Sequence, residues 1–126
     1  MSEPTNERPG VTFARLRALA LALPGVEEGT SYGTPAFRVK GKFFLRLWED
    51  GETLVLKTDF HERDHLLASE PGTFFVTDHY RGHPIVLVRL PAVRPSHLRS
   101  LVEDSWRRHA PARVVAAYDQ RAGGTA

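Results

Sequence analysis

The chain has 126 residues, of which 41% are hydrophobic, and this length and composition suit one domain with a core of its own. It contains no cysteine, which excludes a disulfide framework, a thiolate zinc site and a thiol nucleophile. The formal net charge of +2 permits a polyanionic partner without requiring one, so the positions of the charges matter more than their sum.

Residues 1–11 are polar and contain two prolines, which predicts a disordered tail and neither a signal peptide nor a membrane anchor. Together with the absence of cysteine, this favours a cytoplasmic protein. Thr12 is placed to cap a first helix that runs to about Leu23, where the sequence Leu-Pro-Gly ends it. Residues 26–35 show no hydrophobic period and are rich in Gly, Thr and Ser, so we expect a loop there.

Residues 36–57 alternate between apolar and polar side chains, with breaks at Lys40-Gly41-Lys42 and Glu49-Asp50-Gly51. This pattern predicts three short antiparallel strands joined by tight turns. The side chains expected on the core face are Phe37, Val39, Phe43, Leu45, Leu47, Leu54 and Leu56. Those expected on the outer face are Arg38, Lys40, Lys42, Phe44, Arg46, Trp48 and Lys57, and Arg89 and Phe75 are expected to join them from later strands.

The second half of the chain predicts a helix, a strand pair and two more helices. Asp59 and Glu62 have the spacing of a capping box for a helix that ends before Pro71. Strands are expected at residues 73–77 and 85–90, a long helix from Pro95, and a short last helix from Pro111 to Tyr118 with a frayed tail at 119–126. The whole is one domain, residues 12–118, of the α+β class: two layers, with helices on one face of a single, mainly antiparallel, five-stranded sheet.

Two motifs are compatible with catalysis, but each has a simpler explanation. His61-Glu62-Arg63-Asp64-His65 has the spacing of a helical zinc site. However, Glu62 is needed for the helix cap, and the histidines fall on the solvent side of the helix. Asp78, His79 and either Ser31 or Ser105 could form a hydrolase triad, but no nucleophile elbow surrounds either serine. We therefore expect no metal, no cofactor and no catalytic activity.

The outer sheet face is the strongest candidate for a binding surface. Between Ala36 and Trp48 it offers basic and aromatic side chains and no acidic one. Lysine and arginine can neutralise phosphates, while aromatic rings can stack on bases or sugars. Two alternatives remain open: long basic side chains commonly cover an exposed sheet, and a dimer interface would use Phe44, Trp48 and Arg46 equally well. The loop at residues 78–84 could add an anion donor in Arg81 and a stacking ring in Tyr80, or His79 and Tyr80 could simply lock the hairpin.

A set of short segments lies between about Phe13 and Tyr118, namely Leu23-Pro24-Gly25 with Glu27-Glu28, Gly33 to Phe44, Leu56-Lys57 before Asp59, His79-Tyr80 with Pro84, Leu87 to Leu90, and Ala110-Pro111. Together these segments resemble the MmcQ/YjbR family of small bacterial proteins. The resemblance implies the order helix, three strands, helix, two strands, helix. It also implies a DNA-binding surface with two projecting β-hairpins, or wings. By position, the first wing carries Arg38, Lys40, Lys42 and Arg46, and the second carries His79, Tyr80, Arg81 and His83. Lys42, in the Gly-Lys turn, corresponds most directly.

The favoured hypothesis is therefore a non-catalytic DNA-binding protein that grips duplex phosphates with weak sequence preference. Lys57 is expected to contribute from the sheet between the wings. The alternative is a protein-interaction module, such as a homodimer that buries Phe44 and Trp48, because similar two-layer folds serve as small chaperones. Neither hypothesis requires a small-molecule substrate or a membrane.

Overall fold

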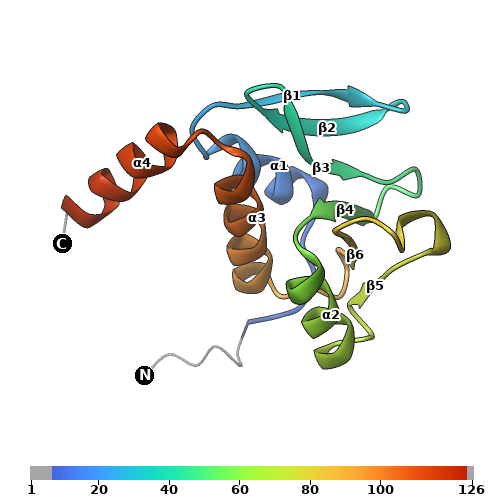
Figure 1. The fold of residues 1–126 in the computed structure, drawn as a ribbon. Coiled ribbons are helices and arrows are strands. Elements are labelled where there is room, and N and C mark those ends of the chain that lie inside the picture. Colours follow the sequence, from blue (N-terminus) through green and yellow to red (C-terminus); the bar gives the residue numbers. More distant parts are fainter. Residues whose placement is uncertain (1–6, 125–126) are drawn as a thin grey trace.

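The computed structural model describes residues 7–124, which form a six-stranded antiparallel sheet in the order β1-β2-β3-β4-β6-β5 (Figure 1). The strands are β1 Val26–Ser31, β2 Thr34–Val39, β3 Lys42–Leu47, β4 Thr53–Lys57, β5 Phe74–Phe75 and β6 Ile85–Arg89. The helices are α1 Phe13–Leu21, α2 Phe60–Ser69, α3 Pro95–His109 and α4 Ala112–Gly124, with a short 3-10 helix, η2, at Asp78–Tyr80. The expected α+β class with a single antiparallel sheet is confirmed, with one strand more than predicted.

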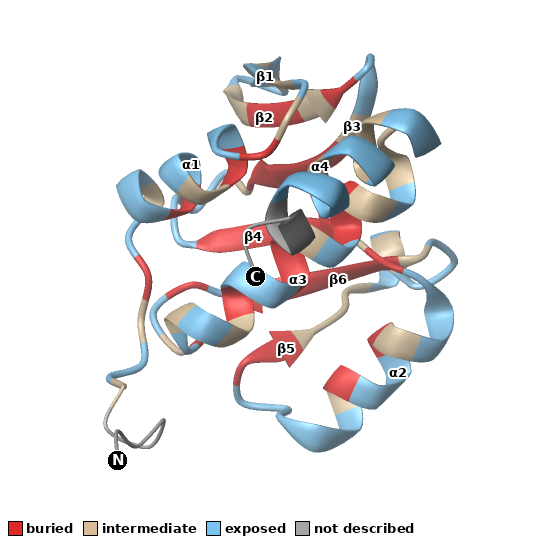
Figure 2. Ribbon diagram, turned by 90° about the vertical axis from the view of Figure 1, so that its left-hand side faces the viewer, coloured by how far each residue is buried: buried red, intermediate tan, exposed pale blue. Residues whose placement is uncertain are grey.

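One face of the sheet carries the main hydrophobic core. Helices α1 and α3 lie along this face, and α2 joins it at the β5–β6 end (Figure 1). Leu16 of α1 and Trp106 of α3 are fully buried against Phe37 and Leu56 of the strands. The indole Nε1 of Trp106 also donates to the carbonyl of Pro24 at 2.9 Å, which fixes the connection between α1 and β1. Figure 2 shows the consequence: the central strands are buried, whereas the helices are buried only along their inner stripes.

The expected loop at residues 26–35 is wrong, because Val26–Ser31 forms the edge strand β1. It pairs antiparallel with β2, from Val26 opposite Val39 to Ser31 opposite Thr34. The alternation of apolar and polar residues is missing because an edge strand that covers little of the core can be polar on both faces. Strand formation here depends on pairing with β2, which the local sequence does not reveal.

Two hairpins close through two-residue turns in which both residues have positive φ. These are Tyr32-Gly33, with φ of 54° and 80°, and Lys40-Gly41, with φ of 51° and 79°. Such turns match the right-handed twist of paired strands, and they favour Asn-Gly at these positions. A tyrosine or lysine in the left-handed region costs about 1–2 kcal/mol, so each turn is strained at its first position.

A β-bulge at Phe44 changes which side chains of β3 face the core. Phe37 pairs with Leu45 and Arg38 pairs with Phe43, so Phe44 is the extra residue of the bulge. Phe44 and Leu45 both enter the main core, and Phe43 turns to the other side of the sheet. The expected positions of Phe43 and Phe44 are therefore wrong. The buried hydroxyl of Ser105 on α3 contacts the Phe44 carbonyl at 3.4 Å, which supplies a donor at the bulge.

The remaining elements agree with the prediction except at their ends. The Asp59 side chain accepts from the Glu62 amide at 2.7 Å and caps α2 as expected. The first helix ends at Leu21 instead of Leu23, and the last helix continues to Gly124, so the frayed end expected from residue 119 is helical as far as Gly124. In Figure 1 this helix projects away from the sheet.

The disordered tail expected over residues 1–11 is not observed in the part the structure describes. The Gly10 amide donates to the Val93 carbonyl at 2.7 Å, the Val11 amide donates to the Leu90 carbonyl at 2.8 Å, and Val11 is buried. These two backbone hydrogen bonds and the burial of Val11 attach the N-terminal segment to the connection between β6 and α3. Residues 1–6 and 125–126 of the expected tails lie outside the described residues.

The β2–β3 turn gives a first test of this fold. Gly41→Ala should lower the free energy of unfolding by about 1 kcal/mol, because a Cβ at φ of 79° is strained even though nothing lies within 4 Å of it. Gly72→Ala is the matched control, since its Cβ also meets open space and its φ lies outside the positive range. We expect it to be neutral or slightly stabilising in urea denaturation. Equal losses in the two variants would contradict the strained-turn assignment.

Candidate functional site

The sheet face opposite the main core carries a second, smaller apolar cluster. Val55, Ile85 and Leu87 are buried there. Rings that are only partly buried surround them, namely those of Phe43, Trp48, Phe75 and Tyr80. We call this side of the sheet the open face. A cluster of partly exposed aromatic rings over a buried apolar floor provides flat surfaces for stacking.

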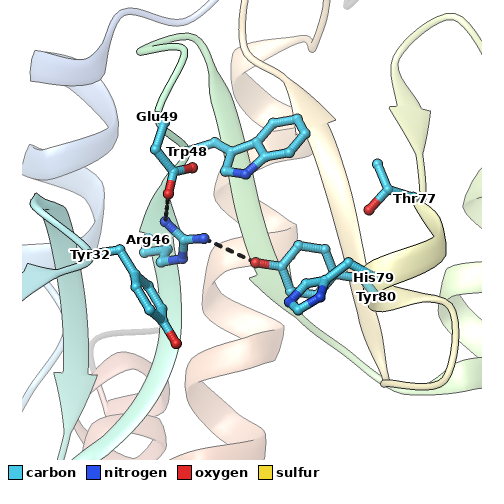
Figure 3. A pocket seen from close by; sticks show the side chains of 7 residues that line it. All are labelled: Tyr32, Arg46, Trp48, Glu49, Thr77, His79 and Tyr80. Atoms are coloured by element: carbon cyan, nitrogen blue, oxygen red, sulfur yellow. Dashed lines mark hydrogen bonds and ion pairs between the residues drawn. The ribbon is translucent and has the colours of Figure 1, made fainter.

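Arg46 lies at the centre of the open face and is only 7% exposed in its side chain. Its Nη2 donates to the Tyr80 hydroxyl at 3.0 Å (Figure 3). Its Nη1 donates to Thr34 Oγ1 and to the Leu47 carbonyl, both at 3.3 Å. The Glu49 carboxylate is 3.7 Å from Nη1. Arg46 is therefore on the predicted face, but its side chain joins β3 to β2 and η2 instead of extending into solvent.

A pocket of about 320 Å³ lies around this guanidinium, and we call it the aromatic pocket. Its lining residues, shown in Figure 3, are Tyr32, Arg46, Trp48, Glu49, Thr77, His79 and Tyr80. Tyr32 is 83% exposed and its ring centroid is 5.2 Å from the Arg46 guanidinium carbon. On the other side, the His79 ring meets the Tyr80 ring edge to face at 4.6 Å. The volume of the aromatic pocket lies at the lower end of the range found for small-ligand sites.

A second hollow of about 280 Å³ adjoins the first, and we call it the cationic hollow. It shares Tyr32, Arg46, His79 and Tyr80 with the aromatic pocket and adds Ser31, Arg38, Phe43, Val55, Lys57 and Ile85. Arg38, Arg46 and Lys57 thus contribute to one hollow, and among the described residues no carboxylate lines it. The Lys57 Nζ lies 5.5 Å from the centre of the Phe43 ring, so its charge is held over an aromatic face.

The other predicted contact residues do not converge on these hollows. Lys40 is exposed in the β2–β3 turn. Lys42 pairs with Val39 of the core face, because the bulge places it on the helix side of the sheet. Arg81 is bound to Asp78 at 3.1 Å, and His83 is exposed outside both hollows. The structure therefore assembles Arg38, Arg46, Lys57, His79 and Tyr80, and leaves the rest of the predicted set outside.

Two aromatic residues differ in role from the sequence prediction. Phe44 is fully buried in the main core, so it cannot take part in a surface contact. Tyr32 lies in the segment expected to be a loop, but it forms a wall of both hollows. The sequence feature that could have predicted the position of Tyr32 is the dipeptide Tyr32-Gly33. A glycine that follows a non-glycine residue in a short polar stretch is compatible with a two-residue hairpin turn.

The catalytic motifs are not assembled in the part of the chain that the structure describes. No group of three metal-ligating side chains is close enough to hold a metal there, and His65 Nε2 lies 3.4 Å from Ser69 on the exposed side of α2. Asp78 accepts from Arg81 instead of from His79. Ser105 is buried on the helix side, away from the open face. Of the helices described, none has the length and apolar character needed to cross a membrane.

The bond between Arg46 and Tyr80 gives a second test. Tyr80→Phe should lower the free energy of unfolding by about 1–3 kcal/mol, because the ring stays in place while Nη2 of a buried guanidinium loses its acceptor. Amide hydrogen exchange should accelerate at residues 78–83, which this bond helps to hold. Tyr118→Phe is the control: its ring packs on Trp106, and no hydrogen bond of its hydroxyl is found among the described residues. Equal effects of the two variants would contradict a specific role for the Tyr80 hydroxyl.

His109 at the end of α3 gives a third test, by its response to pH. Burial lowers its pKa, and the charges of Lys57, Lys42 and Arg108 act in the same direction, whereas a ring contact of 2.7 Å with the Ser105 carbonyl opposes them. Because the unfolded chain binds this proton more tightly, stability should fall as the pH drops through about 6.5. Urea midpoints at about pH 7.5 and 5.5 should differ less in His109→Gln than in the wild type. An unchanged difference in His109→Gln would refute the assignment.

Comparison with known proteins agrees with this fold and identifies its family. Uncharacterized proteins Mb2600 of Mycobacterium bovis and Rv2570 of Mycobacterium tuberculosis are each 40% identical to this chain over 58 residues, which is 46% of this chain and 45% of the relative. The matched region thus spans about half the length of the curated relatives. The crystal structure of Deinococcus radiodurans protein DR2400, a DUF419 domain, aligns with a TM-score of 0.68 and 24% identity over 79% of each chain, and so supports the fold. Residues 21–108, from the end of α1 through nearly all of α3, match the YjbR family model, and the chain belongs to the YjbR family.

Proposed function

We propose that this protein binds nucleic acid, DNA in the first instance, through the open face of its sheet. The observation that carries the proposal is the cationic hollow, where Arg38, Arg46 and Lys57 lie beside aromatic rings and no carboxylate among the described residues lines the surface. Cations supply the affinity for phosphate, and aromatic rings supply contact area for bases or sugars. The role is binding, not catalysis, and a DNA partner would be met in the cytoplasm.

The basic side chains that would contact phosphates are those whose N–H donors are not engaged in an ion pair. No ion pair of Arg38 or Lys57 is found among the described residues, and Arg38 borders the cationic hollow from β2. Lys40 is exposed at the tip of the β2–β3 hairpin, beyond the strand that carries Arg38. These residues form one path from the hairpin tip to the sheet centre. Arg81 and Lys42 contribute less than the two-wing arrangement would require, because Arg81 is paired with Asp78 and Lys42 faces the helix side.

Acidic side chains at the edges of the open face limit how far this path extends. Glu27 is opposite Arg38 across the β1–β2 pair, and Glu49 is 3.7 Å from Arg46. A phosphate chain is therefore accommodated best between them, over Lys57 and the guanidinium of Arg38. The proposed surface is narrower than one that both wings would form, and its affinity should be modest and sensitive to salt.

The salt dependence of DNA affinity tests the proposal. Fluorescence anisotropy of a labelled mixed-sequence oligonucleotide, offered both as a single strand and as a duplex, should show binding that weakens as salt rises from about 50 to 200 mM. Lys57→Ala and Arg38→Ala should each weaken binding and reduce the log–log salt slope by about 0.7–0.9.

The control is Arg99→Ala, a change at an exposed cation of α3 on the helix side of the sheet. It has the same effect on net charge and should leave affinity and slope close to the wild-type values. If all three variants lose affinity equally, binding follows net charge and not the open face. If neither form of DNA binds, and sedimentation shows a dimer that Trp48→Ala separates, the protein-interaction alternative replaces this proposal.

A further inference from the structure

The aromatic pocket has features that phosphate binding alone does not explain. Its walls are the rings of Tyr32, Trp48 and Tyr80, and its base is the buried guanidinium of Arg46 (Figure 3). This guanidinium already bonds Thr34, Leu47 and Tyr80 and has the Glu49 carboxylate at 3.7 Å, so it has less to offer a phosphate than an unpaired arginine would, whereas flat rings surround it. The pocket is therefore built for a planar group.

Tyr32 is placed at a conformational cost. Its φ of 54° is unfavourable for a side chain with a Cβ, and 83% of the residue remains exposed, so burial does not offset the strain. The ring lies over the Arg46 guanidinium instead of inserting into a core. A strained backbone that holds an exposed aromatic ring above a pocket indicates a binding role.

Arg46 retains hydrogen-bond donors for a ligand. A guanidinium has five N–H groups, and the hydrogen bonds to Thr34, Leu47 and Tyr80 use at most three of them. Among the described residues none of these bonds involves Nε. No fully buried side-chain nitrogen in that part of the chain lacks a partner, so Nε is not completely buried. A ligand in the pocket can therefore accept from Arg46 without breaking its existing bonds.

The charge balance favours a neutral ligand over an anion. Glu49 lies 3.7 Å from Arg46 and lines the same pocket, so a carboxylate or phosphate placed there would be repelled by it. A nucleobase is planar, neutral and rich in acceptors along its edges, and it can stack on tyrosine or on a guanidinium. The neighbouring cationic hollow, with Arg38 and Lys57, is then placed to receive the attached phosphates.

We infer that the aromatic pocket takes one unstacked nucleobase, so that the protein binds single-stranded nucleic acid in preference to duplex. This inference rests on the proposed function and adds the form of nucleic acid that the site selects. In a duplex the bases are stacked and paired, and they cannot enter a pocket without being pulled out. In a single strand the bases are free to stack on the rings while the backbone follows the cationic hollow.

The test compares one mixed-sequence 12-nucleotide DNA strand with the same strand annealed to its complement, at equal ionic strength, by anisotropy with the full chain. We expect the wild type to bind the single strand more tightly by on the order of tenfold, since base–aromatic stacking has effects of this size. Binding of the single strand should also quench the fluorescence of Trp48, whose ring lines the pocket.

The decisive variant is Tyr32→Asn. Asparagine is favoured at the first position of this turn, so the variant should melt at or above the wild-type temperature while it lacks the stacking ring. It should bind the single strand about tenfold more weakly and show no preference between the two forms. Phe60→Ala, which removes an exposed aromatic ring on α2 outside both hollows, is the control and should keep the preference.

The outcomes separate this inference from the proposed function. Equal, salt-sensitive binding of strand and duplex by the wild type would overturn the base pocket and leave the proposed function standing. A preference that persists in folded Tyr32→Asn would likewise overturn the pocket. Failure of the wild type to bind either form would overturn both.

Discussion

The β-bulge at Phe44 decides which side chains of β3 face the helices and which face the open side. Strict alternation would place Phe43 inside and Phe44 outside, together with Lys42. The extra residue allows Phe44 and Leu45 to enter the core in succession, while Phe43, Arg46 and Trp48 reach the open face. The bulge therefore exchanges Phe44 for Phe43 on the open face and moves Lys42 to the helix side, whereas Arg46 and Trp48 face the open side in either register. The Ser105 hydroxyl supports this irregular pairing from α3.

Arg46 converts this arrangement into a site. Its guanidinium bonds Thr34 at the start of β2 and Tyr80 in η2, so it joins two segments that the sheet alone does not connect. A charge at this depth is retained only where hydrogen bonds satisfy it, and here backbone, hydroxyl and carboxylate groups share that task. The side chain expected to extend toward DNA thus organises the walls of the pocket instead.

The unpaired basic side chains of the open face are concentrated in one region of it. Arg38 and Lys57 remain available beside aromatic rings, whereas Arg81 is neutralised by Asp78 and Lys42 lies on the other side of the sheet. The proposed surface is thereby narrower than two wings would form: the cationic hollow carries Arg38 and Lys57, and the aromatic pocket adjoins it. This arrangement is the reason for proposing a single strand, whose bases are free to stack, over a rigid duplex.

The sequence by itself determined the α+β class, the cap at Asp59, the two tight turns around Lys40 and Asp50, and the exposure of Arg38 and Trp48 to one side. These features follow from local rules of periodicity, capping and turn formation. Only the tertiary structure decided that Val26–Ser31 is a strand, because an edge strand needs its partner and not its own alternation. The tertiary structure also decided which sheet face Phe43, Phe44 and Lys42 occupy. A run of apolar residues can pair with the neighbouring strand in either of two registers, and the bulge determines which of them forms. The contacts that bring Tyr32, Arg46 and Tyr80 together were likewise decided by the tertiary structure, because no local pattern encodes contacts between a turn, a strand and a distant 3-10 helix.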